Sequence, residues 1–291
     1  MNCHNGETFL QEAIQSVIQQ KYKKWELIFW DNNSSDNSAK IFKSFKDKRL
    51  KYYFRKKKVS LYESRNAAIK KTKGKYIAFL DADDLWLPDK LSLQIKQFKD
   101  PKVGLVYGKY IKKNDSSFFR KKQLITKANL PEGYITNHLL KYYCVGLLTI
   151  MLRKKFLNKS KIFKTKYNYL GDLDFVLRFS KKYKFAAVQK VIGIYRQHEN
   201  QMQRTYYKIK SQQFSKWYKE LCKTKLLGEK KDLEIFKEWE RFQSCLSIIK
   251  SRKNFYSLSK LINYPNNLNK IKLLIIFFMP EFISKRIVAE T

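Results

Sequence analysis

Hydrophobic residues recur along the first 110 residues with two periods, one helical and one nearly continuous. Residues 7–20 place Leu10, Ile14 and Val17 on one face of a helix, which gives that segment an apolar stripe. Four short apolar runs follow, at residues 25–30, 50–54, 76–80 and 103–107. Helical segments separate these runs, at about residues 37–46, 63–73 and 88–99. Because nearly continuous apolar runs are typical of strands buried on both faces, this alternation predicts an α/β sheet flanked by helices.

The pattern becomes less regular after residue 130 and changes again near residue 200. Helices are expected near residues 136–143 and 172–183, and strands near residues 146–152 and 185–195. Beyond residue 200 every signal is helical. We therefore predict an α/β domain over residues 1–200 and a helical C-terminal extension over residues 201–291.

Carboxylates cluster where two of the predicted strands end. Asp31 directly follows one apolar run, and three acids follow another: Asp81, Asp83 and Asp84. Ligands of open α/β sheets bind at the carboxyl ends of the strands. There is no GxGxxG after the first strand and no GxxxxGK[ST], which excludes dinucleotide-binding and P-loop arrangements. We therefore expect these acids to hold a nucleotide through Mg²⁺ or Mn²⁺, which bind one or two carboxylates together with substrate phosphates.

An isolated Asp-x-Asp also has a structural interpretation, in which its carboxylates cap the following helix. Asp89 is better placed for that role, because Pro88 opens the predicted helix. Asp36 is likewise interpreted as a cap. Asp81 emerges directly from an apolar strand, which favours a functional role for the pair.

The chain is strongly basic, with 62 Lys and Arg against 25 Asp and Glu and a formal net charge of +37. The excess is spread along the chain and forms no basic arm. Its field favours anions in general, whether nucleic acid, an anionic membrane surface or phosphorylated substrates. The charge and the 19 tyrosines leave a nucleic-acid-binding protein as an alternative, but no basic stripe or binding motif indicates a specific nucleic-acid partner.

Cysteine and histidine indicate neither a metal cage nor a disulfide framework. The four cysteines form no CxxC pair, and the three histidines show no ligand spacing with them. The first ten residues lack a secretory pattern, so we expect a cytoplasmic protein. The longest apolar stretch, Leu273 to Met279, is far shorter than the ~20 residues of a membrane-spanning helix. Two interpretations of it stay open: a buried segment, or peripheral contact with the anionic inner face of the cell membrane.

Four segments resemble a known family. NGETFLQEAIQSVIQQKYKKWELIFWDNNSSDNS and FLDADDLWLPDKL resemble the opening and the D-x-D segment of the family 2 glycosyltransferases. YLGDLDFVLR and YRQH resemble their acidic catalytic segment and their closing Arg–His element, and all four occur in order within about residues 1–200. The resemblance implies a GT-A fold and an inverting, metal-dependent transfer of a sugar from a nucleotide-diphosphate donor, typically a UDP-sugar. It also implies a glycan or lipid-linked acceptor in the synthesis of a surface polysaccharide.

The resemblance assigns donor-binding roles to five positions. Asp31 would accept the imide N–H of a uracil-like base. Arg65 and Asn66 match a segment that lines the nucleotide pocket. Asp81 would lie beside the ribose and the metal, and Asp83 would bind the metal directly.

Four further positions take roles in the later part of the resemblance. Arg196 and His198 would approach the diphosphate, with His198 also counted among the metal ligands. Asp172 would be the general base for the acceptor hydroxyl, and its place at the start of an apolar helix would keep it ionised. A simple N-cap role for Asp172 stays open, with Asp174 as the fallback base.

Two features depart from the family pattern. The family begins with a buried apolar strand, whereas this chain begins MNCHNG, so either Met1 is internal to a longer reading frame or the central strand is missing. The second interpretation leaves an inactive relative as an alternative function. Gly171 stands where the family more often has Glu before the catalytic Asp.

Overall fold

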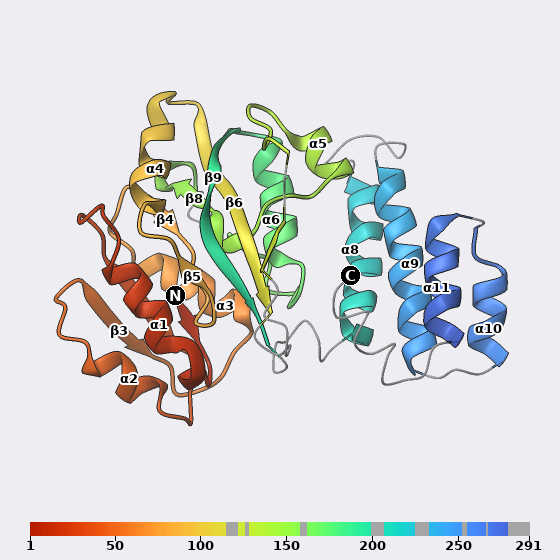
Figure 1. Ribbon diagram of the computed structural model, residues 1–291, viewed down its shortest axis with the longest axis horizontal. Coiled ribbons are helices and arrows are strands. Elements are labelled where there is room, and N and C mark those ends of the chain that lie inside the picture. Colours follow the sequence, from red (N-terminus) through yellow and green to blue (C-terminus); the bar gives the residue numbers. More distant parts are fainter. Residues whose placement is uncertain are drawn as a thin grey trace. The chain divides into compact units, whose positions relative to one another are not determined.

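The computed structural model describes residues 1–114, 122–125, 128–157, 162–198, 207–224, 233–251, 255–265 and 267–278. The chain divides into two compact units, Met1–His198 and Glu199–Thr291 (Figure 1). The described residues of each unit include a hydrophobic core of their own.

The first unit opens with three strands and three helices. In chain order these are β1 (Asn2–Cys3), α1 (Glu7–Ile18), β2 (Leu27–Asp31), α2 (Ser38–Ser44), β3 (Leu50–Phe54) and α3 (Leu61–Lys71). The strands pair in the order β1-β2-β3, all parallel. Helix α1 buries its apolar stripe, as the sequence predicts. Helix α3 begins where the Ser60 hydroxyl accepts a hydrogen bond from the Glu63 backbone N–H, a capping contact that fixes the start of the helix.

A second, mixed sheet forms the rest of the first unit. Its elements are β4 (Tyr76–Ala78), β5 (Leu85–Trp86), α4 (Lys90–Lys96), β6 (Val103–Asn114), β7 (Lys122–Leu124), α5 (Thr136–Lys141), β8 (Met151–Arg153), α6 (Gly171–Ser180) and β9 (Lys184–Gln197). The strand order is β4-β8-β6-β9-β5, with β7 beside β6. Strands β6 and β9 are parallel to each other and are the long strands of this sheet (Figure 1).

Strand β1 links the two sheets. Asn2 pairs with Trp30 of β2 and also forms an isolated parallel bridge with Asp81, just after β4. The Met1 amine donates a hydrogen bond to the Ile28 carbonyl at 2.9 Å, and burial lowers the pKa of this amine to about 5. The two residues of β1 thus bring the carboxyl ends of β2 and β4 together.

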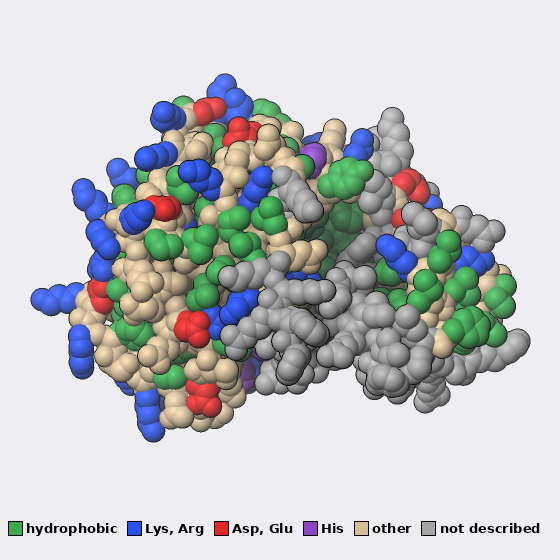
Figure 2. Space-filling view, viewed as in Figure 1, with side chains coloured by type: hydrophobic (Ala, Val, Ile, Leu, Met, Phe, Trp, Pro, Cys, Tyr) green, Lys and Arg blue, Asp and Glu red, His purple; other side chains and the backbone are tan. Residues whose placement is uncertain are grey.

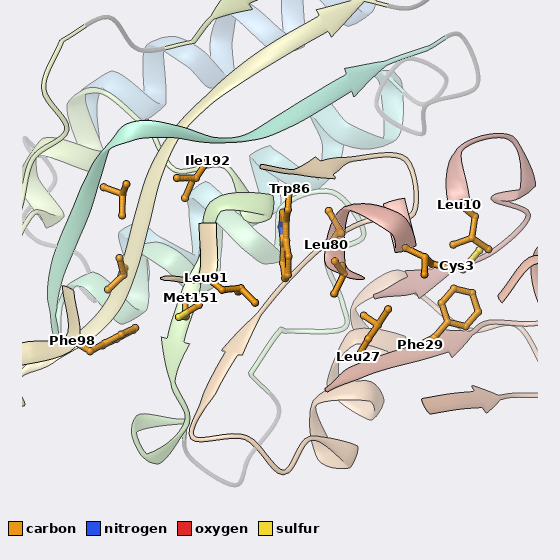
Figure 3. Close-up of a cluster of buried hydrophobic side chains, with 14 of the residues drawn as sticks. Cys3, Leu10, Leu27, Phe29, Leu80, Trp86, Leu91, Phe98, Met151 and Ile192 are labelled. Carbon is orange, nitrogen blue, oxygen red and sulfur yellow. The ribbon is translucent and has the colours of Figure 1, made fainter. Parts of the chain in front are cut away.

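The main core runs across this junction. Figure 3 shows Cys3, Leu10 and Phe29 from the first sheet and its helix in the same cluster as Trp86 and Met151 from the second. The acidic strand ends of both sheets therefore border one continuous core.

Several elements differ from the predicted ones. Strand β6 continues to Asn114, well past the apolar run that ends at Tyr107, because β9 pairs with it along its length. Strand β5 was not predicted, since two residues are too few to show a period. The expected strand near 146–152 is divided into a 3₁₀ turn at Leu147–Thr149 and the short strand β8.

The second unit is helical in its described residues, with α8 (Tyr207–Thr224), α9 (Glu234–Ser251), α10 (Phe255–Ile262) and α11 (Leu268–Phe278). Leu273 and Ile276 of α11 are buried in the core of this unit, whereas Ile275 and Phe278 are exposed. One face of the apolar stretch therefore packs inward and another faces solvent, and Met279 lies outside the described residues. Among the described helices, none combines the length and the apolar character needed to cross a bilayer.

Candidate functional site

Three carboxylates follow β4 in the turn that leads to β5. Asp84 points inward: it is buried, and its Oδ1 accepts a hydrogen bond from the Arg196 backbone N–H at 3.0 Å. Burial, together with the neighbouring charges of Asp83 and Asp81, raises the pKa of Asp84 well above its ordinary value. The side chains of Asp81 and Asp83 are 36% and 32% exposed. Asp84 thus ties the turn to β9, and Asp81 and Asp83 are the accessible carboxylates.

Asp83 faces His198 at the end of β9. Asp83 Oδ2 and His198 Nε2 lie 3.1 Å apart, and the imidazole packs against the Phe9 ring with centroids 4.8 Å apart. The two atoms are at hydrogen-bond distance, and a carboxylate oxygen and an imidazole nitrogen are both groups that can bind a divalent cation. Within the described ranges, no three His, Cys, Asp or Glu side chains gather into a closed metal cage. A cation held here would therefore take its remaining ligands from substrate and water.

Asp81 is paired with a buried arginine. Arg65 Nη2 donates to both Asp81 carboxylate oxygens, at 2.6 and 2.8 Å. Burial alone would lower the pKa of Arg65, but the Asp81 carboxylate raises it above its ordinary value. The pair fixes the orientation of Asp81 and places one permanent positive charge beside the acidic turn.

Asp31, at the end of β2, has no exposed surface. Its Oδ2 accepts a hydrogen bond from the Tyr52 hydroxyl at 2.6 Å, and its Oδ1 accepts one from the Ser34 backbone N–H at 2.8 Å. Burial and the Asp31 carboxylate raise the pKa of Tyr52 above its ordinary value, so Tyr52 remains a donor. In this structure Asp31 holds β3 and the turn after β2 together, and a base could reach it only if these neighbours moved.

Asp172 lies in the first turn of α6. Its Oδ1 accepts hydrogen bonds from the Tyr62 hydroxyl at 3.0 Å and from the Leu173 backbone N–H at 2.9 Å. The cap position of α6 is occupied by Leu170, so the alternative in which Asp172 is the N-cap is wrong. The carboxylate is only partly buried. Tyr62 of α3 therefore orients the Asp172 carboxylate, which remains partly accessible to solvent.

Asp174 is more deeply buried than Asp172. Its side chain is fully buried and forms ion pairs with Arg178 at 2.7 Å and with Lys164 at 3.3 Å. A base must reach an acceptor hydroxyl. The structure therefore disfavours the fallback assignment to Asp174.

Two other predicted site residues are engaged in contacts within the fold. The Asn66 side chain donates to the Phe163 carbonyl and accepts from the Phe163 backbone N–H, at 2.8 and 3.0 Å. Arg196 Nη2 pairs with Glu12 of α1 at 2.9 Å, and its guanidinium lies 4.6 Å from the Phe9 ring centroid. Both residues position segments around the acidic turn.

Successive contacts connect the predicted site residues at the two strand ends with α6. Cys3 is the register partner of Asp31, and Asn2 bridges to Asp81. The guanidinium of Arg65 lies 5.3 Å from the Tyr62 ring centroid, and Tyr62 donates to Asp172. The contacts run in order through Asp31, Cys3, Asn2, Asp81, Arg65, Tyr62 and Asp172.

Tyr62, Tyr52 and the inward role of Asp84 were not predicted from the sequence. Tyr62 stands three residues before Arg65 but just outside the helix predicted over residues 63–73; a helix begun two residues earlier, as α3 does at Leu61, would have placed both on one face. No comparable signal marks Tyr52, because its contact with Asp31 depends on the register of two strands. Figure 2 shows Lys and Arg side chains scattered over the visible face of the described residues, with uncharged side chains between them.

A sequence model described as "Glycosyl transferase family 2" matches residues 1–159. A UDP-Glc:alpha-D-GlcNAc-diphosphoundecaprenol beta-1,3-glucosyltransferase, WfgD, from Escherichia coli is 34% identical over 158 residues, which cover 54% of this chain and 60% of that protein. A putative teichuronic acid biosynthesis glycosyltransferase, TuaG, from Bacillus subtilis is 26% identical over 155 residues, covering 52% and 60%. The chain thus spans less than two thirds of the length of these relatives.

A solved structure supports the fold independently. The mannosyltransferase PcManGT from Pyrobaculum calidifontis, in complex with GDP-Man and Mn²⁺, superposes with a TM-score of 0.60 at 15% sequence identity. The match covers 99% of this chain and 83% of that one. The arrangement of two sheets and flanking helices therefore corresponds to the predicted GT-A fold.

Proposed function

Because the chain belongs to glycosyl transferase family 2, we propose that it transfers a sugar from a nucleotide-diphosphate donor to a hydroxyl group of a glycan or lipid-linked acceptor. The observation that carries the proposal is the placement of two functional pairs around α3 and the turn after β4. One pair, Asp83 and His198, suits a cation and a diphosphate. The other, Tyr62 and Asp172, suits a base that takes a proton.

The chemistry requires stabilisation of a leaving diphosphate. Bond cleavage at the anomeric carbon leaves negative charge on phosphate oxygens, and a bound Mn²⁺ or Mg²⁺ would neutralise part of it. Asp83 and His198 would hold that cation, and Asp81 would orient the donor beside it. Arg65 contributes a fixed positive charge next to Asp81.

The acceptor hydroxyl must lose its proton as it attacks a sugar of oxocarbenium character. Asp172 would accept that proton on the face opposite the leaving diphosphate, which inverts the anomeric configuration. Asp172 lies in the first turn of α6, where the Tyr62 hydroxyl and the Leu173 backbone N–H hold its Oδ1.

We assign the donor to the UDP-sugars. WfgD is named for UDP-Glc, which supports this choice. In the proposal, Asp31 reads a uracil-like base after the turn at Ser34 has shifted, because the carboxylate is enclosed in the present structure. Arg196 and Asn66 would act indirectly, by holding α1 and the segment at Phe163 around the donor.

The acceptor is proposed to be lipid-linked, as part of surface polysaccharide synthesis. The names of WfgD, which acts on a diphosphoundecaprenol-linked sugar, and of TuaG support this class. Ile275 and Phe278 of α11 are exposed near Lys272, which would suit peripheral contact with an anionic membrane surface that carries such an acceptor.

The test is release of UDP from a panel of UDP-sugars by the purified chain, with Mn²⁺ and a lipid-diphosphate-linked sugar. Asp172→Asn should lower the transfer rate by about 10²- to 10⁴-fold while the affinity for the donor is retained. Asp89→Asn is the matched control, because Asp89 is half exposed and pairs only at the surface with Lys21. Donor binding by wild type without any transfer would favour the inactive relative instead.

A further inference from the structure

Helix α3 serves both halves of the candidate site from one face. Tyr62, Arg65 and Asn66 are spaced i, i+3 and i+4, so their side chains project in similar directions. Arg65 reaches Asp81, and Tyr62 reaches Asp172. Asn66 holds both backbone polar groups of Phe163, whose ring packs on Tyr62 with centroids 5.3 Å apart.

Tyr62 is held tightly. Its side chain is 2% exposed, with Phe163 on one side and the start of α6 on another. Burial and the Asp172 carboxylate raise the pKa of Tyr62 well above its ordinary value, so the phenol keeps its proton and acts as a hydrogen-bond donor.

Gly171 provides the space that this tyrosine occupies. A Cβ added at Gly171 would lie 2.6 to 2.7 Å from three ring atoms of Tyr62, closer than van der Waals contact allows. The ring is the rigid part of the side chain, so a larger residue at 171 would require the Tyr62 ring or the start of α6 to move, and either movement changes the geometry of the hydrogen bond to Asp172.

We propose that Tyr62 is a positioning residue for the general base, that its hydroxyl orients the Asp172 carboxylate and stabilises its charged form, and that Gly171 is required because it admits the ring. This inference rests on the proposed function, since it takes Asp172 as the base. It adds a hydrogen-bond donor to Asp172, the Tyr62 hydroxyl, that the resemblance did not assign.

Other groups also face Asp172, and their contributions must be separated from that of Tyr62. Arg65 on α3 lies close enough to interact with the Asp172 charge. The phenols of Tyr110 on β6 and Tyr143 after α5 also interact with that charge. Because Tyr62→Phe leaves these three groups in place, it isolates the hydroxyl.

The first measurement is the pH profile of kcat/KM for wild type and Tyr62→Phe. Loss of the hydrogen bond from the Tyr62 hydroxyl should move the acid limb of the pH profile to higher pH by about half a unit to one unit. It should also lower kcat roughly 10-fold, with little change in the affinity for the nucleotide-sugar. Tyr107→Phe is the matched control, because it removes another buried tyrosine hydroxyl, one that donates to the Pro131 carbonyl. It should leave the profile unchanged.

The second measurement tests the role of the glycine. Gly171→Ala should reproduce the shift of the acid limb, and adding it to Tyr62→Phe should produce no further shift, because both changes remove the same hydrogen bond. Gly104→Ala is the matched control, since its Cβ would meet Tyr183 and Phe179 at comparable distances elsewhere in the unit. It should lower stability without moving the profile.

Failure of this inference and failure of the proposed function give different results. If wild type transfers sugar and depends on Asp172, an unshifted profile in Tyr62→Phe overturns the positioning role alone. If wild type transfers nothing, NMR titration of the Asp172 carboxyl carbon still decides the question. The inference requires protonation at a higher pH in Tyr62→Phe than in wild type, and identical titration curves overturn it.

Discussion

Asp31 at the end of β2 and Asp83 in the turn after β4 both follow the carboxyl end of a strand, but they differ in burial and in their hydrogen-bond partners. Asp31 has no exposed surface and is held by the Tyr52 hydroxyl and the Ser34 backbone N–H. Asp83 is one-third exposed and faces the imidazole of His198. The comparison teaches that a strand-end position brings a carboxylate to the edge of a sheet, while its neighbours decide whether it is available to a ligand.

The largest effect on activity is expected from replacing Asp83, the exposed carboxylate of the two. Asp83→Ala should lower kcat/KM by about 10³-fold in the presence of Mn²⁺, because the cation loses a charged ligand beside the departing diphosphate. The midpoint of thermal unfolding should barely change, since the side chain has no fold-stabilising partner apart from His198 among the contacts described for it. Transfer rates and melting curves, measured on the same preparations, check both statements. Undiminished activity would remove Asp83 from the metal-binding role.

Replacing Asp31, the buried carboxylate, should lower stability, whereas replacing Asp83 should leave it nearly unchanged. Asp31→Ala should lower the free energy of unfolding by about 2–3 kcal/mol, because it leaves the Tyr52 hydroxyl and the Ser34 N–H without their acceptor. Chemical denaturation followed by circular dichroism gives this value. Tyr52→Phe is the control that removes only one of the two hydrogen bonds, so it should cost less. A variant as stable as wild type would show that Asp31 is free to serve a ligand.

Lys90 extends the comparison to a buried basic group, which has an uncharged side chain and an aromatic ring as its neighbours. Its Nζ donates to the Gln94 side-chain oxygen and lies 4.2 Å from the Trp86 ring centroid. Burial lowers the pKa of Lys90 well below its ordinary value. Between the folded and the unfolded pKa values the unfolded chain binds more protons, so stability falls as the pH decreases through that range.

Replacing this lysine should have the smallest effect of the three. Lys90→Met keeps most of the buried volume and removes the charge, so it should raise the unfolding midpoint by about 2–4 °C at pH 7 and make its pH dependence shallower. Melting curves at several pH values between 6 and 10 provide the test. An unchanged pH dependence would mean that Lys90 does not titrate differently in the two states.

Much of the α/β unit was predictable because it depends on local periodicity. The helix over residues 7–20 appears as Glu7–Ile18, and the strand at 50–54 appears with the same bounds. The DxD turn was also recognisable, because carboxylates stand out directly after an apolar run. The pairing of Asp174 with Lys164 and Arg178 was not predictable, since it depends on how α6 packs against a distant segment.

The amino-acid order by itself determined the alternation of strands and helices, the acidic strand ends and the family to which the chain belongs, because each of these is written in short segments. Only the tertiary structure decided that Asp31 is enclosed, that Asp83 meets His198 and that Tyr62 donates to Asp172. The physical reason is that burial and hydrogen-bond geometry arise between residues 21 to 115 positions apart, where local pattern carries no information about distance.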